Sequence, residues 1–435
     1  MKILNDAPVR KAFWRLMPLI VVCYFVAYLD RANVGFAAVH MSQDIGLTAS
    51  AFGFGAGLFF LTYFLLEVPS NLLLARYGAR RWIARIMFTW GAMSGAMAFV
   101  TNEPSFYTVR LLLGAAEAGF FPGITYFVTL WFPAAYRARI MAFFLCAAPI
   151  SLSLGGPVSG ALLGLDGLLG IPGWRWMFIM EALPAIVLSF VVLRYLTDRP
   201  SDAAWLTPEE RADLTERLAI DSQRSLATAH HHSLFQALFN LRVLLFGVAN
   251  FAIVMASYGV SFFLPRIVKE FGLSDLQTGF LSAVPYALAA ISLVWWGKRS
   301  DARLERRFHT LIPIVFASMG LAAAALSTGP VMQMMAFCCA AIGCWAAMPV
   351  FWPLCFGNIP SKNAAGAIAV INAIANLGGF AGPSVMGFFR DHTGGFMTGL
   401  LVLAGVNLVA AAIVVLVGRG HAHEGGIAES RPVAT

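Results

Sequence analysis

The feature that most constrains the fold of this chain is a succession of long apolar runs separated by short polar segments. About 20 apolar residues in a helix are enough to cross the ~30 Å hydrocarbon core of a bilayer. Runs of this kind lie near 13–39, 48–75, 82–101, 104–132, 140–164 and 174–196, and again near 241–268, 274–297, 310–327, 329–357, 364–388 and 395–418. We therefore predict an all-α polytopic membrane protein with twelve transmembrane helices.

The composition agrees with a bilayer as the main partner. Hydrophobic residues make up 59% of the chain and charged residues 12%, which leaves too little polar surface for a water-soluble domain. The net charge of +8 does not indicate a nucleic-acid partner, because the basic residues lie in short segments between apolar runs. The six cysteines lack the spacing of a metal site. We expect no metal, no cofactor and no enzymatic activity.

The basic residues also predict the orientation in the membrane. With both termini in the cytoplasm, 24 of the 30 lysines and arginines lie on the cytoplasmic side, two lie within spans and four lie outside. Cytoplasmic loops of membrane proteins carry such an excess of basic residues. We expect a multi-pass protein of the cytoplasmic (inner) membrane, present as a monomer, whose first apolar run is not removed as a signal peptide.

An internal repeat divides the chain into two halves. Gly46-Leu47-Thr48 and Gly272-Leu273-Ser274 are 226 residues apart, and the same offset relates Gly156-Pro157 to Gly382-Pro383. Parallel six-helix repeats predict two bundles that face each other across a central cavity, as in alternating-access carriers. The predicted domains are the first bundle at 1–196, a cytoplasmic connector at 197–240, the second bundle at 241–418 and a tail at 419–435.

The connector contains one helix-start signal and one polar tract. Thr207-Pro208-Glu209-Glu210 has the pattern of a capping box with proline at the first helical position, and predicts a surface helix. His230-His231-His232 could bind a metal, but we favour a solvated tract.

Asp30 and Arg31 lie side by side within the first span. Asp30 is 15 residues beyond Arg15, which corresponds to roughly 22 Å along a helix. Charged groups at that depth are rare in membrane helices and are usually functional. Neighbouring helical residues diverge by about 100°, so each of these two needs its own partner or its own aqueous cavity. The alternative is that both lie near the outer interface and reach water.

Arg110, Gly114 and Glu117 share one face of the fourth span. Glycine on that face allows another helix to pack closely. We favour a structural role for Arg110 and a functional one for Glu117. Desolvation favours the neutral form of a carboxyl group that lies away from cations, which is the property a proton carrier needs.

Arg31 is the candidate anion ligand, because a guanidinium group can hold a carboxylate through two parallel hydrogen bonds. The Tyr28 hydroxyl group could add a donor. In the second half, Asn372 and Asn376 are one helical turn apart and could bind substrate hydroxyl or carboxylate groups. The alternative is that these asparagines hold helices together. Glu67 is interpreted as structural.

Several stretches together resemble a known family. They are YLDRANVGF at 28–36, FLLEVPSN at 64–71, RLLLGAAEAG at 110–119 and GWRW at 173–176. With them the sequence resembles the major facilitator superfamily, and within it the anion:cation symporter family. AFGFGAG at 51–57 and ARRWIAR at 79–85 are most similar to bacterial tartrate transporters.

The resemblance implies a symporter that imports a small organic anion, first of all tartrate, together with protons. It implies proton coupling by Asp30 as well as Glu117. The predicted gating residues are Arg80, Arg81, Asp301 and Arg306. The acid of the superfamily's loop after the second span is replaced here by Ala75, so we expect the inner gate to rely on Asp301 for its carboxylate. Alternatives are an aromatic-acid permease of the hydroxyphenylacetate type, an exporter or antiporter, or a sensor that does not transport.

Overall fold

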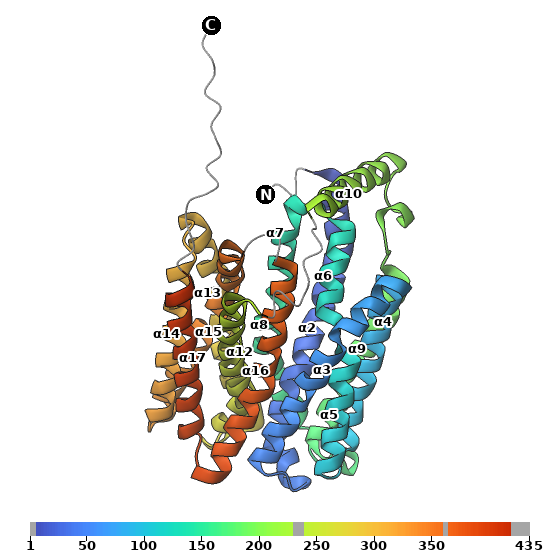
Figure 1. Ribbon diagram of the computed structural model, residues 1–435. Coiled ribbons are helices and arrows are strands. Elements are labelled where there is room, and N and C mark those ends of the chain that lie inside the picture. Colours follow the sequence, from blue (N-terminus) through green and yellow to red (C-terminus); the bar gives the residue numbers. More distant parts are fainter. Residues whose placement is uncertain (1–5, 229–238, 360–363, 419–435) are drawn as a thin grey trace.

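The computed structural model describes residues 6–228, 239–359 and 364–418. Within these ranges the chain is almost entirely helical and contains no β-strand (Figure 1). Eleven segments of the described chain are long and apolar enough to cross a membrane. This confirms the prediction of an all-α polytopic membrane protein.

The helices follow the predicted apolar runs. The first half contains α2 (Ala7–Asp44), α3 (Ala49–Tyr77), α4 (Ala79–Ala96), α5 (Glu103–Glu117), α6 (Phe120–Trp131), α7 (Ala134–Leu145), α8 (Ala147–Leu163) and α9 (Gly173–Tyr195). The second half contains α12 (Leu241–Lys269), α13 (Asp275–Arg303), α14 (Arg307–Leu326), α15 (Pro330–Asn358), α16 (Ala364–Thr393) and α17 (Met397–Val417).

The third predicted span corresponds to α4 and the short 3-10 helix η1 (Met97–Phe99). The sequence of α4 opens with Arg80, Arg81 and Arg85, so it is too charged to count among the eleven segments. It nevertheless packs along α9, with Trp90 and Ser94 buried. We assign α4 as the twelfth membrane-crossing helix.

Two predicted spans are each built from two helices. The fourth breaks between α5 and α6, at Ala118 and Gly119. Gly119 has a φ of 88°, in the left-handed region that glycine adopts without a steric penalty. The break follows directly after Glu117, which is therefore the last residue of α5. The fifth span is divided at Cys146 into α7 and α8.

The internal repeat is visible in how the two halves meet. Adding 226 to the bounds of α3 gives those of α13. Each of these two helices packs against a helix of the other half. On α3, Gly53 packs against the backbone of Pro383 in α16, while on α13, Gly279 packs against that of Gly156 in α8. Small residues allow such close crossings in membranes. The repeat therefore produces two equivalent contacts between the halves.

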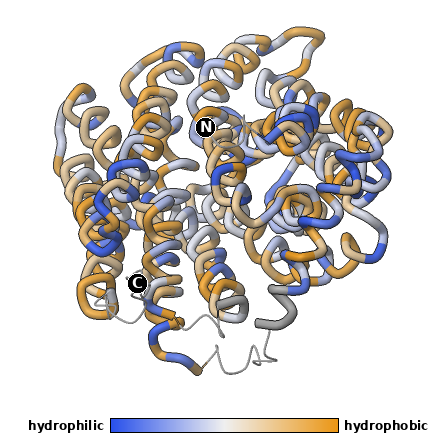
Figure 2. Tube along the Cα trace, turned by 90° about the horizontal axis from the view of Figure 1, so that it is seen from above, coloured by the Kyte–Doolittle hydropathy of each residue, from blue (hydrophilic) through white to orange (hydrophobic). Residues whose placement is uncertain are grey.

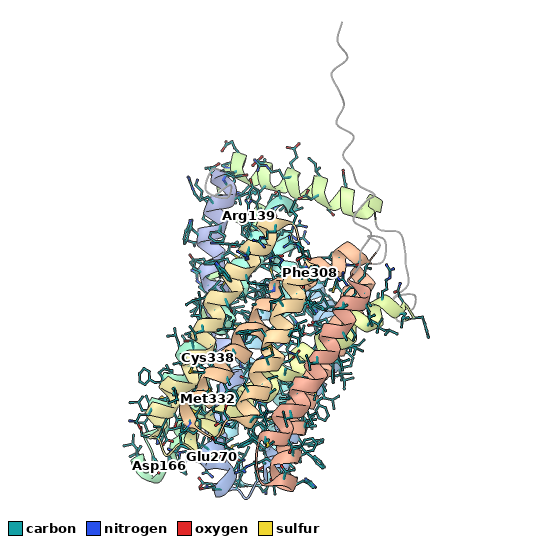
Figure 3. All side chains as sticks on the ribbon, turned by 90° about the vertical axis from the view of Figure 1, so that its left-hand side faces the viewer. Arg139, Asp166, Glu270, Phe308, Met332 and Cys338 are labelled. Atoms are coloured by element: carbon teal, nitrogen blue, oxygen red, sulfur yellow. The ribbon has the colours of Figure 1, made fainter. Side chains whose placement is uncertain are left out.

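The ends of the helices define two faces. The connector helix α10 (Pro208–Thr228) lies across one end, which we call the connector face (Figure 1). In Figure 3, Asp166 and Glu270 lie at the opposite face, whereas Arg139 lies near α10. At the opposite face, Asp391 of α16 accepts hydrogen bonds from the backbone N–H groups of Ala49 and Ser50 at 3.1 and 2.7 Å. The two halves are therefore joined there.

The connector helix begins as the sequence predicts. The Thr207 hydroxyl group accepts a hydrogen bond from the Glu210 backbone N–H group at 3.2 Å, and the Glu210 carboxylate accepts one from the Thr207 N–H group at 3.0 Å. Lys11 of α2 forms a 2.6 Å ion pair with Glu210.

Seen from above, hydrophilic segments are interspersed among mostly hydrophobic helices (Figure 2). The histidine tract at 230–232 lies outside the described residues, and the domain boundaries stay predictions.

Candidate functional site

Arg31 and Glu117 form an ion pair between α2 and α5. The Arg31 Nη2 and Nε atoms both donate to Glu117 Oε1, at 2.5 and 2.9 Å. The Glu117 side chain is only 1% exposed, and that of Arg31 13% exposed. Glu117 therefore does not lie away from cations, the condition under which desolvation alone would favour its neutral form. Sequence spacing could not show this, because the arginine comes from another span. Each charge instead compensates the other in a buried setting.

Aromatic rings surround the Arg31 guanidinium group. Its central carbon lies 5.1, 5.4 and 5.3 Å from the ring centroids of Tyr28, Phe59 and Tyr63. Aromatic faces attract a cation at such distances. Tyr28, which we predicted to be a substrate ligand, is therefore next to Arg31. The site combines a fixed positive charge with a largely aromatic wall.

Tyr258 of α12 adds a contribution from the second half. Its hydroxyl group accepts a hydrogen bond from Arg31 Nη1 at 3.3 Å. Sequence reasoning missed this residue, although a signal was available. Tyr258 is 227 residues after Arg31, within one residue of the position that the repeat offset makes equivalent. The ion pair is thus located where the two halves meet.

Asp30 points away from this site, towards α4. Its carboxylate accepts hydrogen bonds from Trp90 Nε1, from Ser94 Oγ at 2.6 Å and from Asn33 Nδ2 at 3.1 Å. The residue is 2% exposed. The prediction that adjacent Asp30 and Arg31 have separate partners is confirmed. The alternative in which both reach water at the interface is wrong, because Asp30 is bonded inside the first half and Arg31 is bonded to Glu117 and Tyr258.

Arg110 and Gly114 contribute to packing. Arg110 Nη2 donates to the Ala56 carbonyl group of α3 at 2.9 Å, and its guanidinium group lies 5.1 Å from the Phe59 ring centroid. A Cβ atom on Gly114 would collide with the Phe59 carbonyl oxygen. The close approach of α3 and α5 that we predicted for this glycine is confirmed, and Arg110 has the structural contacts that we favoured.

Asn372 and Asn376 both bind Glu67. Their Nδ2 atoms donate to Glu67 Oε1 and Oε2, each at 3.2 Å, and so join α16 to α3. Glu67 is one helical turn from Tyr63, on the connector side of Arg31. The structure thus shows that these two amides can hold a carboxylate. Sequence reasoning did not predict that a carboxylate of this chain would occupy them.

The predicted gating residues form two separate groups. Arg306 Nη2 pairs with Asp301 Oδ1 at 2.7 Å, so these two lie together at the connector end of α13. The Arg80 backbone N–H group donates to Asp198 at 2.8 Å, and Arg81 is exposed. Among the described residues no ion pair joins Arg80 or Arg81 to Asp301.

The described residues contain no group of three or more His, Cys, Asp or Glu side chains placed to hold a metal ion.

The fold and this charged site between two helical halves define a membrane transporter for a small molecule. A family profile described as the Major Facilitator Superfamily matches residues 20–383. The chain belongs to the major facilitator superfamily, and it is a multi-pass membrane protein.

Relatives and solved structures agree with this assignment. Two proteins of Agrobacterium vitis, provisionally named tartrate transporters, are 46% and 45% identical over 410 and 423 residues. The first alignment covers 94% of this chain and 91% of the relative, and the second covers 97% of both. A bacterial homologue of the human lysosomal transporter Spinster, crystallised in an inward-facing and occupied conformation, has a TM-score of 0.75 at 15% identity. That comparison covers 93% of this chain and 96% of the other.

Proposed function

We propose that this protein imports a small organic anion together with protons, by alternating access, and that tartrate is its first candidate substrate. The Arg31–Glu117 ion pair is the observation that carries the proposal. Arg31 is a ligand for a carboxylate, but here it is already held by one. A substrate carboxylate can take its place only if the charge on Glu117 is removed.

Protonation of Glu117 supplies that step. When Glu117 is neutral, Arg31 loses its charge partner and is free to bind a substrate carboxylate through its planar guanidinium group. When the substrate leaves, Glu117 releases its proton and binds Arg31 again. Proton and anion therefore bind together or leave together, which is the requirement for symport. Asp30 is the second proposed proton carrier, and its hydrogen-bond partners are separate from those of the anion ligand.

Substrate binding also needs donors in the second half. Tyr258 already contacts Arg31, and Asn372 and Asn376 already hold a carboxylate. A dicarboxylate with hydroxyl groups can contact Arg31 with one end and the asparagines with the other. Rearrangement of these contacts on substrate binding closes the carrier on one side of the membrane and opens it on the other. We propose that the connector face is cytoplasmic, that the membrane is the inner membrane and that the monomer transports without chemically converting its substrate.

The rings around Arg31 favour an aromatic carboxylate as the second candidate substrate. Tyr28, Phe59 and Tyr63 all lie within 5.4 Å of the guanidinium carbon, measured to their ring centroids. An aromatic acid would add ring contacts that tartrate cannot make. Identity to relatives named for tartrate supports the first candidate, and the aromatic wall supports the second.

The deciding experiment is uptake into proteoliposomes of labelled tartrate and of labelled hydroxyphenylacetate, under imposed pH, sodium and voltage gradients. We expect accumulation of tartrate that requires an inward proton gradient. Accumulation of hydroxyphenylacetate but not of tartrate would make the aromatic acid the substrate. Outward transport would indicate an exporter, stimulation by sodium alone would replace the coupling ion, and ligand binding without movement would indicate a sensor.

A further inference from the structure

The first half contains a buried carboxyl group, that of Glu181, which is not part of the site described above. Glu181 of α9 is 2% exposed, in the interior of the first half. Its Oε1 atom is hydrogen-bonded to Ser159 Oγ of α8 at 2.7 Å. Its Oε2 atom is buried and has no hydrogen-bond partner among the described residues. A buried acid with one bare oxygen requires an explanation.

Asn33 connects Glu181 to Asp30. The Asn33 amide group donates to Asp30 Oδ1 at 3.1 Å, and its side chain also faces that of Glu181. An amide NH2 group carries two N–H bonds, so one group can serve two carboxyl groups. Asp30, Asn33 and Glu181 therefore lie together in the interior of the first half, with a hydrogen bond between Asn33 and Asp30.

The hydrogen bonds in this network are unequal. Asp30 accepts three, from Trp90, Ser94 and Asn33, which suits an ionised carboxylate. Glu181 has one firm partner and a bare oxygen. An ionised carboxylate is far more costly than a neutral carboxyl group when it is buried with an unpartnered oxygen. Asp30, which is also acidic, is a charged neighbour of Glu181. A proton held by the pair therefore belongs on Glu181.

The depth of Glu181 suits a proton route. Glu181 is eight residues from the start of α9 at Gly173, roughly 12 Å from the face opposite the connector. Asp30 is 14 residues from the end of α2 at Asp44, roughly 21 Å from the same face. Glu181 is thus nearer to the face from which an importer would receive its protons.

We propose that Glu181 and Asp30 form one proton-binding unit joined by Asn33, in which Glu181 holds the proton in the conformation described here. This rests on the proposed proton coupling and refines it, because it assigns one of the transported protons to a pair of residues. The Arg31–Glu117 site binds the other proton. The proton enters at Glu181 and passes to Asp30 when the helices rearrange, which leaves Glu181 ionised and ready to be protonated again from outside.

The first test is the ratio of protons to substrate in proteoliposomes, measured for Glu181→Gln, Asp30→Asn and the double variant. We expect each single change to lower the ratio by one, and the double variant to lower it by one as well, because both residues belong to one unit. Glu103→Gln, an exposed glutamate at the start of α5, is the matched control and should keep the ratio of the unmodified protein. An unchanged ratio in Glu181→Gln would overturn the proposal.

The second test needs no substrate. Infrared difference spectra of the purified protein in lipid detect the C=O stretch of a protonated carboxyl group. That band should be present at neutral pH and disappear in Glu181→Gln. If this variant does not fold, Ser159→Ala should shift the band, because it removes a hydrogen bond to Glu181. A spectrum without the band, or unaffected by either change, would refute the proposal even if proton-coupled transport is established. Uncoupled uptake with the band present would refute the proposed coupling, and with it the transport role of the pair, but would leave the protonation of Glu181 established.

Discussion

Both hydrogen bonds from Arg31 to Glu117 end on the same carboxylate oxygen, from Nη2 at 2.5 Å and from Nε at 2.9 Å. The pair joins α2 to α5, and Arg31 also reaches Tyr258 in the other half of the molecule. The Arg31 guanidinium group, which would bind the substrate, is therefore hydrogen-bonded both to the titratable acid Glu117 and to Tyr258 of the opposite half. This relationship underlies the first two predictions.

Arg31→Lys should largely abolish anion binding although the charge is kept. Lysine cannot form two parallel hydrogen bonds to a carboxylate, and a hydrogen bond to a charged group contributes about 2 kcal/mol, or roughly thirty-fold in affinity. Titration calorimetry with tartrate measures the change. Arg199→Lys, at an exposed arginine outside the predicted site and gates, is the control that should bind normally. Near-normal affinity in Arg31→Lys would contradict the assignment of Arg31 as anion ligand.

Glu117→Gln and Asp30→Asn should each weaken accumulation driven by a proton gradient, because each removes one of the two protons proposed to move with the substrate. At least one of them should retain exchange of labelled for unlabelled substrate, because exchange requires the loaded carrier to cycle but no net movement of protons. Counterflow assays in proteoliposomes measure this separately from accumulation. If binding is lost along with both activities, the two acids are structural or bind the ligand directly.

Glu67→Gln should increase affinity for the anion. Glu67 occupies Asn372 and Asn376 through hydrogen bonds of 3.2 Å, so it competes with a substrate carboxylate for the same donors. A neutral glutamine competes less, because hydrogen bonds to charged groups are the stronger ones. We expect a several-fold decrease in Kd by calorimetry, with Glu216→Gln in α10 unchanged. An unaltered Kd in Glu67→Gln would show that the substrate does not use these amides.

Uptake of tartrate should be nearly indifferent to membrane potential at fixed pH. Moving a dianion into a negative cell costs about 2.3 kcal/mol per charge per 100 mV, or about 4.6 kcal/mol in total. Two protons cancel this charge, and we propose two sites, one at Glu117 and one at Asp30 with its network. Initial rates under potassium–valinomycin potentials measure the effect. Marked stimulation by an inside-negative potential would require a third proton or a monoanionic substrate.

The attachment of α10 to the first half should depend on the charge of Asp6. Burial opposes ionisation of Asp6, but hydrogen bonds from Arg217 at 2.6 Å and Tyr136 at 2.9 Å outweigh it, so that its pKa lies below the usual 3.8. The stabilisation is therefore present above about pH 4 and is lost as pH falls through the lowered pKa. Asp6→Asn should speed hydrogen exchange in α10 at neutral pH. Unchanged exchange would mean that the other contacts of α10, such as Lys11 with Glu210, are sufficient.

The sequence by itself determined the membrane class, the succession of spans and the repeat, because these follow from local properties. Apolar runs fix where helices cross a bilayer, and an offset of 226 residues relates α3 to α13 whatever their packing. It also identified Asp30, Arg31 and Glu117 as unusual, since a charge in an apolar run is visible without coordinates.

Only the tertiary structure decided which groups are partners. Arg31 and Glu117 are 86 residues apart, and Glu67 and Asn376 are 309 residues apart. No periodicity relates such positions, because the angle at which each helix faces its neighbours is set by packing across the whole bundle. For that reason the ion pair at Glu117, the occupied asparagines and the bare oxygen of Glu181 became visible only when the helices were brought together.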